Sequence, residues 1–202
     1  HIESMISFKY KNPKFKFESN SSYLISSIQA VKALKKIDKK RLQLISNKNF
    51  FIIGNRVSNE LKKIGIKKIN LVCEDSKMLI QKLKLKKFRN LEINYLCSNE
   101  YNKELENILK KMNINIKINF IYRTIGRKEL TQKTIKYINN KKIKEVVFYS
   151  SYSAKIFMNL IKKSQIETEV LKDIKFLCLS DRIKKTVKSE KFINVHSSKK
   201  PS

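Results

Sequence analysis

Polar turn residues follow short apolar runs in this chain, and these turns are natural places for binding chemistry. The run Phe50–Ile53 is too short for a helix and suits a buried parallel strand. Gly54 and Asn55 then permit a tight turn, after which apolar residues recur at helical spacing over 57–64 and Gly65 can end the helix. Because ligands of open α/β sheets bind at the carboxyl ends of the strands, this turn is a candidate binding segment.

The same strand–turn–helix pattern recurs along the chain. The polar turn residues at the equivalent positions are Ser27, Asn55, Ser76, Ser98, Ser150 and Ser180. Arg56 and Arg182 stand beside two of these turns. Each residue has an ordinary alternative role, because serine at such a position commonly caps the following helix and arginine in a basic chain is commonly solvated.

Part of the pattern repeats at a nearly constant spacing. Residues 23–34 resemble 146–157 at an offset of 123, and the turn at Gly54 resembles that at Ser180 at an offset of 126. Ordered matches of this kind indicate two similar α/β domains. The alternative is coincidence, since short strand–helix units look alike in any α/β protein.

The charge of the chain is strongly positive. Its 202 residues include 46 Lys and Arg against 17 Asp and Glu, a formal net charge of +29. An excess of this size favours a polyanionic partner. The lysines are spread along every predicted helix, however, and the sequence contains no zinc finger, RNP-type aromatic motif or basic tail. A small polycarboxylate therefore suits the charge as well as a nucleic acid does.

The cysteines and histidines do not form a metal-binding pattern. Cys73, Cys97 and Cys178 are widely spaced within or at the end of apolar runs, and the two histidines are His1 and His196. We therefore expect reduced cysteines in a cytoplasmic protein, with neither a metal site nor a disulfide framework. No apolar run approaches the roughly 20 residues of a membrane span, and no signal peptide is visible.

The order of predicted elements suggests two domains. Strands and helices alternate over 23–124, which implies a parallel sheet covered on both faces. We expect a first, complete α/β domain at 11–117 and a second at 125–202, with linker strands at 5–10 and 118–124. The second domain lacks one strand–helix–strand set, so we expect a chain truncated at both ends, whose missing N-terminal strand and helix belong to the second domain.

Taken in order, these motifs resemble those of the uroporphyrinogen-III synthase family. The segments that carry the resemblance are SMISFKY, YLISSIQAVKAL, FFIIGNRVSNELKKIGI, VCEDSKMLIQKL, YLCSNEYNKELENILKKMNI, INFIYRTI, VVFYSSYSAKIF, FLCLSDRIKKTV and NVHSSKKPS. The resemblance covers essentially the whole chain. It implies two flavodoxin-like domains with parallel sheets, one inserted in the other and joined by a two-stranded linker ladder.

The resemblance also implies a reaction and a tyrosine. The family cyclises hydroxymethylbilane to uroporphyrinogen III, inverting the last pyrrole ring (ring D) and losing water, a hydro-lyase reaction of heme biosynthesis without metal or organic cofactor. Tyr122 matches the family's active-site tyrosine. Its phenol can give a proton or a hydrogen bond to the departing hydroxyl group, so Tyr122 is the expected catalytic residue.

The eight carboxylates of that substrate suit N–H donors and positive charge at the strand ends. The implied substrate-binding residues are Ser27, Gly54, Asn55, Ser58, Ser76, Ser98, Ser150, Ser180 and Arg182. Ser58 is included because Val57 stands where the family has a threonine. We expect a monomer that contacts hydroxymethylbilane synthase transiently, with neither a nucleic-acid nor a membrane partner.

Two other functions remain open at this stage. A two-domain α/β protein of this kind could hold a small anion without catalysis, and formation of product from hydroxymethylbilane would distinguish the two. A basic protein associated with nucleic acid would instead bind tightly to duplex or single strands, with a steep dependence on salt.

Overall fold

The computed structural model describes residues 1–10, 21–85, 91–164, 166–188 and 194–197. The chain forms two compact units: a discontinuous unit, His1–Ser7 with Ile125–Ser202, and an inserted unit, Phe8–Thr124. Each unit is described by itself below.

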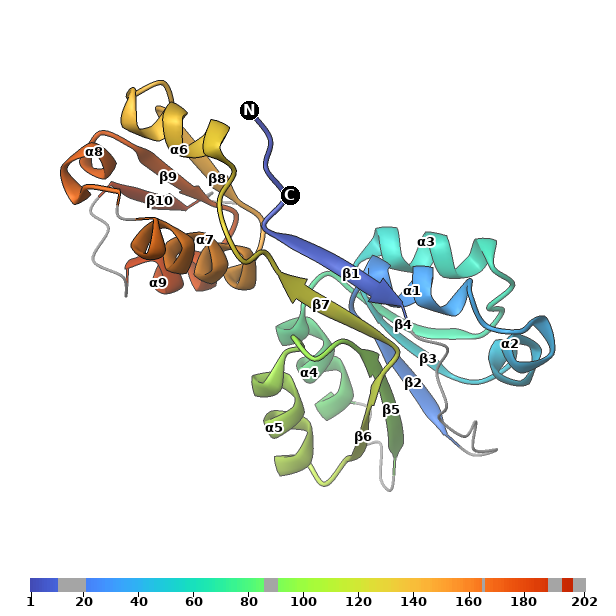
Figure 1. The fold of residues 1–202 in the computed structure, drawn as a ribbon. Coiled ribbons are helices and arrows are strands. Elements are labelled where there is room, and N and C mark those ends of the chain that lie inside the picture. Colours follow the sequence, from blue (N-terminus) through green and yellow to red (C-terminus); the bar gives the residue numbers. More distant parts are fainter. Residues whose placement is uncertain (11–20, 86–90, 165, 189–193, 198–202) are drawn as a thin grey trace. The chain divides into compact units, whose positions relative to one another are not determined.

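The inserted unit contains a five-stranded parallel sheet (Figure 1). Its strands are β2 (Ser22–Ile25), β3 (Phe50–Ile53), β4 (Ile69–Cys73), β5 (Glu92–Cys97) and β6 (Asn115–Phe120). Their order is β4-β3-β2-β5-β6, so the chain moves outward from β2 to β4 and then crosses back to β5. This makes β2 and β5 the neighbours at the topological switch point, where doubly wound sheets bind ligands.

Helices cover both faces of this sheet. They are α1 (Ile28–Leu34), α2 (Lys39–Ser46), α3 (Asn55–Lys63), α4 (Ser76–Leu85) and α5 (Lys103–Lys111). Successive strand residues point to opposite faces. Tyr23 and Phe50, paired across β2 and β3 with ring centroids 5.3 Å apart, pack with α1, α2 and α3. Leu24 and Phe51 point the other way and pack with α4 and α5. Burial on both faces explains why these strands are apolar throughout.

The predicted α/β class with parallel sheets is confirmed. Counted from β2, the strand order in the inserted unit is 3-2-1-4-5, which begins as the dinucleotide-binding fold does rather than as flavodoxin does. The term flavodoxin-like therefore holds for the layers but not for the order of the strands.

The discontinuous unit repeats part of this arrangement. Its elements are α6 (Gln132–Asn139), β8 (Glu145–Phe148), α7 (Ser151–Lys163), α8 (Thr168–Lys172), β9 (Lys175–Cys178), α9 (Asp181–Lys188) and β10 (Val195–Ser197). The parallel order β10-β9-β8 corresponds to β4-β3-β2, as the repeat in the sequence predicts. Phe148 and Phe176 stack with ring centroids 6.1 Å apart in a core completed by α7 and α9.

One predicted strand is wrong. The alternation over 116–124 predicts a single strand, whereas the structure has β6 ending at Phe120 and a second strand, β7 (Tyr122–Gly126), paired with β1 (Ile6–Tyr10). Ile121 lies between the two strands, and its N–H group donates to the carbonyl oxygen of Cys97 at 3.0 Å. This hydrogen bond holds the interruption between β6 and β7 at the end of β5. The ladder strand expected at 118–124 is therefore shifted to β7.

Two short helices were also missed. α2 lies between α1 and the loop expected around Ser46–Asn49, where no separate helix was predicted, and α8 precedes β9. In α2 only Ile45 is buried, so the apolar periodicity that signals a helix is nearly absent. The side chain of Asp38 accepts a hydrogen bond from the N–H group of Lys40 at 2.6 Å and caps this helix.

Replacing Leu61 with Ala should destabilise the inserted unit by about 2–5 kcal/mol, because this α3 side chain is completely buried. Urea unfolding followed by tyrosine fluorescence measures the effect. Leu44→Ala on α2, where the side chain is 62% exposed, is the matched control and should change stability by less than about 0.5 kcal/mol. Equal midpoints for the two variants would contradict the assigned core.

Candidate functional site

The carboxyl ends of β2 and β5 form the centre of the candidate site. Ser26 and Ser27 follow β2, and Ser98 follows β5. The helices after these two strands cover opposite faces of the sheet. The chain therefore leaves the sheet in two directions here, and this is the position at which ligands bind in sheets of this architecture.

Tyr122 is the first residue of β7 and lies near the carboxyl ends of these strands. Its side chain is only 6% exposed and packs against Phe8 and Tyr10 of β1, with ring centroids 6.1 and 6.4 Å away. Ser27 and Ser98 lie near its hydroxyl group and lower its pKa. The phenol is thus close to two serines that follow the switch-point strands.

The environment of Tyr122 keeps its phenol protonated. Burial raises the pKa of Tyr122, and the nearby side chains of Ser27 and Ser98 oppose this only in part. Nearby Cys97 and Tyr10 raise the pKa slightly further. At neutral pH the group is therefore a proton donor rather than a phenolate.

A second phenol lies at the same edge of the sheet. The hydroxyl group of Tyr95 is 2.7 Å from that of Ser26, and burial raises the pKa of Tyr95 to about 12. Tyr95 is not among the site residues predicted from the sequence. Its sequence signal is weak, because a tyrosine inside an apolar strand usually packs in the core.

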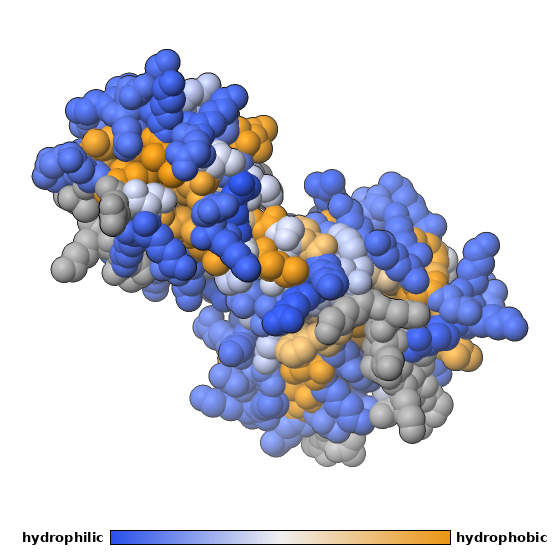
Figure 2. Space-filling model, viewed as in Figure 1, coloured by the Kyte–Doolittle hydropathy of each residue, from blue (hydrophilic) through white to orange (hydrophobic). Residues whose placement is uncertain are grey.

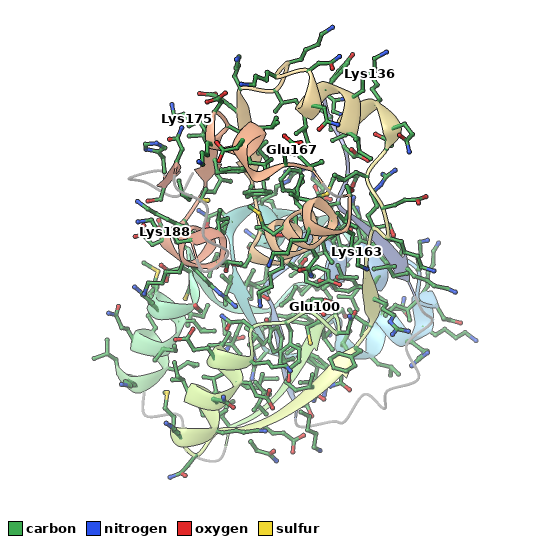
Figure 3. All side chains as sticks on the ribbon, turned by 60° about the vertical axis from the view of Figure 1, so that its left-hand side comes forward. Glu100, Lys136, Lys163, Glu167, Lys175 and Lys188 are labelled. Carbon is green, nitrogen blue, oxygen red and sulfur yellow. The ribbon has the colours of Figure 1, made fainter. Side chains whose placement is uncertain are left out.

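Ser98 and Asn99 attach β7 to the end of β5. The side-chain oxygen of Asn99 accepts the N–H of Thr124 at 2.9 Å, and its amide donates to the carbonyl oxygen of Thr124 at 3.3 Å. Ser98, 1% exposed, accepts the hydroxyl hydrogen of Thr124 at 3.2 Å. Glu100, labelled in Figure 3, also donates its N–H to Ser98, at 3.1 Å. Ser98 is thus a turn and docking residue, and Asn102 caps α5 instead.

The other predicted residues of the inserted unit lie along the same edge of the sheet, with one buried exception. Ser27 caps α1 by accepting the N–H of Gln29 at 3.1 Å. Gly54 has φ +100, a conformation that favours glycine. Asn55 and Ser76 are the first residues of α3 and α4. The exception is Ser58, whose side chain is 4% exposed on the buried face of α3.

Ser150, Ser180 and Arg182 belong to the discontinuous unit, at the carboxyl edge of its own sheet. Ser150 caps α7 by accepting the N–H of Ser153 at 3.0 Å. Ser180 accepts the N–H of Ile183 at 3.4 Å, and Arg182 is exposed in the first turn of α9. The structure therefore gathers Tyr122, Ser27 and Ser98 at one point, and the ligand contacts of the remaining residues stay predictions.

Neither a metal centre nor a spanning helix is found in the described part of the chain. No group of three or more His, Cys, Asp or Glu side chains there could hold an ion. No helix there is long and apolar enough to cross a membrane. The three cysteines are buried and unpaired.

Replacing Asn99 with Ala should expose the Thr124 amide hydrogen and speed its exchange with solvent by about tenfold or more, since a hydrogen bond at a partly buried site is lost. Asn99→Asp is the matched control, because it keeps the oxygen that accepts this N–H. Hydrogen exchange measured by NMR distinguishes them. Equal exchange in the parent and the Ala variant would show that Asn99 does not hold β7.

Comparisons with known proteins agree with this architecture. The uroporphyrinogen-III synthase HemD family model matches residues 10–202. No functionally curated protein matches the chain. Uroporphyrinogen-III synthetase from Helicobacter pylori 26695 is 18% identical with a TM-score of 0.69, over 98% of this chain and 85% of that one. A mutant uroporphyrinogen III synthase from the extremely thermophilic bacterium Thermus thermophilus is 12% identical with a TM-score of 0.59, over 98% and 82% of the two chains.

At these identities the solved structures establish a shared fold, and the family model establishes the relationship. The match takes in both units and every residue predicted for the site. The chain therefore belongs to the uroporphyrinogen-III synthase family, whose members are enzymes of tetrapyrrole biosynthesis.

Proposed function

We propose that this chain is a lyase that converts hydroxymethylbilane to uroporphyrinogen III, with Tyr122 as the catalytic proton donor. The observation that supports the role of Tyr122 is its position, because this phenol is buried, protonated and near Ser27 and Ser98 at the switch point of the sheet. Family membership supports the proposed reaction, and the position of Tyr122 supports its proposed role as the proton donor.

In the first step, the bond between the terminal methylene carbon and its hydroxyl oxygen breaks. The electron pair leaves with the oxygen, the Tyr122 hydroxyl group supplies a proton, and water departs. The substrate becomes an azafulvene cation, and the serine hydroxyls stabilise the phenolate.

In the second step, a substituted carbon of the last pyrrole ring attacks the methylene carbon of the cation with an electron pair of that ring and gives a spiro intermediate. Fragmentation and closure at the other side of this ring invert it. The closing carbon then loses a proton, which restores the phenol. The balance is one substrate for one product and one water, so no oxidant, reductant or second substrate is consumed.

The charges of the inserted unit support a polycarboxylate substrate. A cavity of about 180 Å³ between α1 and α3 is lined by Ile28, Val31, Lys32, Lys35, Arg56 and Glu60. Lys35 pairs with Glu60 at 3.1 Å, whereas within the described ranges Lys32 and Arg56 have no ion-pair partner. Arg56 lies in the first turn of α3, where a cation opposes the helix dipole, so helix stability does not explain its position.

The helix starts and the surface agree with this interpretation. The first turn of α3 contains no acidic residue, and Gly54 before it offers no capping side chain, which leaves the N–H groups of this turn to other anions. Hydrophilic residues cover most of the visible face of each unit in Figure 2. In Figure 3 the labelled Lys136, Lys163, Lys175 and Lys188 come from different elements, so the charge of the discontinuous unit is distributed. A nucleic-acid interface would instead concentrate it on one face.

Three finer features belong to the same proposal. The enzyme acts as a monomer, works in the cytoplasm, and receives hydroxymethylbilane through transient contact with hydroxymethylbilane synthase. The instability of this substrate, which closes spontaneously to the non-inverted isomer, is the chemical reason for rapid transfer between the two enzymes.

Tyr122→Phe should lower kcat for isomer III by about a hundredfold, the lower end of general acid catalysis, because the substrate is itself reactive. The ring contacts with Phe8 and Tyr10 are retained, so the fold should be unaffected. The measurement is isomer separation after a coupled assay. Tyr101→Phe removes a hydroxyl group that donates to Glu106 at 2.5 Å and should leave kcat within about twofold. Equal kcat in the two variants would remove Tyr122 from catalysis.

Arg56→Gln should raise KM for hydroxymethylbilane by about three- to tenfold and leave kcat nearly unchanged, because it removes a carboxylate contact made equally before and during reaction. Lys62→Gln, in the last turn of the same helix, is the charge-matched control. An identical KM in both variants would place substrate binding elsewhere.

A further inference from the structure

We propose that the cavity between α1 and α3 binds one carboxylate arm of a pyrrole ring of the substrate, and that Glu60 is a specificity-determining residue that keeps the second arm of the same ring out. The inference rests on the proposed function, because each ring of hydroxymethylbilane carries two such arms, an acetate and a propionate. Glu60 is not among the site residues predicted from the sequence.

Two helix faces form the walls of this cavity, which has a volume of about 180 Å³. On the α1 side, Ile28, Lys32 and Lys35 follow one another at spacings of four and three residues, which places them on one face of the helix. On α3, Glu60 follows Arg56 at a spacing of four residues and shares its face. Cations therefore stand on both walls, and among the described lining residues Glu60 is the acidic one.

Both carboxylate oxygens of Glu60 are engaged by lysines. Oε2 is 3.1 Å from Nζ of Lys35 on the opposite wall, and Oε1 is 2.6 Å from Nζ of Lys63 on α3. The ammonium groups of Lys63 and Lys35 lower the pKa of Glu60, so this carboxylate is ionised at neutral pH. Lys35 is thereby withdrawn from ligand binding, whereas Lys32 and Arg56 have no ion-pair partner within the described residues.

The rest of the cavity suits an alkyl carboxylate. Ile28 is half-buried and Val31 is buried, and together they give the cavity an apolar side that can remove methylene groups from water. The guanidinium group of Arg56 can bind a carboxylate through two parallel hydrogen bonds, and the ammonium group of Lys32 can add a point charge. Inorganic phosphate would use the two cations but not the apolar side.

Glu60 makes the entry of a second carboxylate unfavourable. The two arms of one pyrrole ring are attached to adjacent carbon atoms, so the second carboxylate lies close to the first. Inside the cavity it would be repelled by Glu60 and would find Lys35 already paired. The ring therefore binds with one arm in the cavity and the other outside, which restricts the orientations that a ring can adopt at this site.

The test compares two stable porphyrins that do not react. Uroporphyrin I has an acetate and a propionate on each ring, whereas coproporphyrin I has a methyl group in place of each acetate. Glu60→Gln removes the repulsion and frees Lys35 for a second carboxylate. We therefore expect it to lower the Kd for uroporphyrin I by about three- to fivefold and to change that for coproporphyrin I by less than about twofold. Porphyrin fluorescence during titration measures both constants.

Asp38→Asn is the matched control for the loss of an acidic charge. Asp38 does not line the cavity, and the variant keeps the side-chain oxygen that caps α2. Both Kd values should therefore stay within about twofold of those of the parent.

Lys32→Gln tests the cavity without disturbing the pair between Lys35 and Glu60. It should raise the Kd for both porphyrins by about three- to fivefold, because the first carboxylate loses a cation. Lys62→Gln, in the last turn of α3, is the charge-matched control and should leave both values nearly unchanged. An unchanged Kd for both porphyrins in Lys32→Gln would place the carboxylate arm elsewhere and would overturn the proposal.

The remaining outcomes separate the parts of the proposal. Equal changes for the two porphyrins in Glu60→Gln, or no change for either, would overturn the role of Glu60. In the parent, butyrate should displace coproporphyrin I at a lower concentration than inorganic phosphate does, because its methylene groups use the apolar side of the cavity. The reverse order would indicate a general anion site and would overturn the assignment to an alkyl carboxylate.

These measurements are independent of the reaction, because neither porphyrin is a substrate. The expected shifts in Kd from a protein that forms no isomer III would support the cavity and reject the proposed function. Formation of isomer III without these shifts would support the proposed function and reject the cavity.

Discussion

The attachment of β7 to the end of β5 is the interaction on which the site depends. The side chain of Asn99 binds the backbone of Thr124 on both sides, and Ser98 binds its hydroxyl group. The chain therefore leaves β6 and turns back across the carboxyl ends of the strands. This path places Tyr122, two residues before Thr124, at the switch point rather than beyond the sheet.

Burial at this point sets the protonation state of two phenol groups. Tyr122 and Tyr95 are almost completely buried, and each hydroxyl group lies near a serine that follows β2. Desolvation raises both pKa values and keeps both phenols protonated, while the neighbouring serines oppose this shift in part. The same burial excludes water from a reaction that begins by releasing one molecule of it.

Local patterns predicted much of the fold, and contacts distant in sequence explain what they missed. The run Phe50–Ile53 and the following turn were correctly placed, because apolar length and glycine act within a few residues. The alternation of apolar and polar residues over 116–124 could not show that this segment forms two strands. The interruption depends on a hydrogen bond from Ile121 to Cys97, which is distant in the sequence. Asn99 and Tyr95 escaped selection for the same reason, because their roles depend on β7 and on Ser26. Tyr122 was selected through family resemblance, and the structure then supplied its environment.

The most direct test is the identity of the product. Hydroxymethylbilane is generated in situ, this protein is added, and the uroporphyrin isomers I and III are separated after oxidation. The proposed function predicts isomer III, at a rate proportional to the amount of folded protein. Only isomer I, at the rate of the reaction without protein, would contradict a synthase activity of this chain and would favour a protein that binds the anion without transforming it.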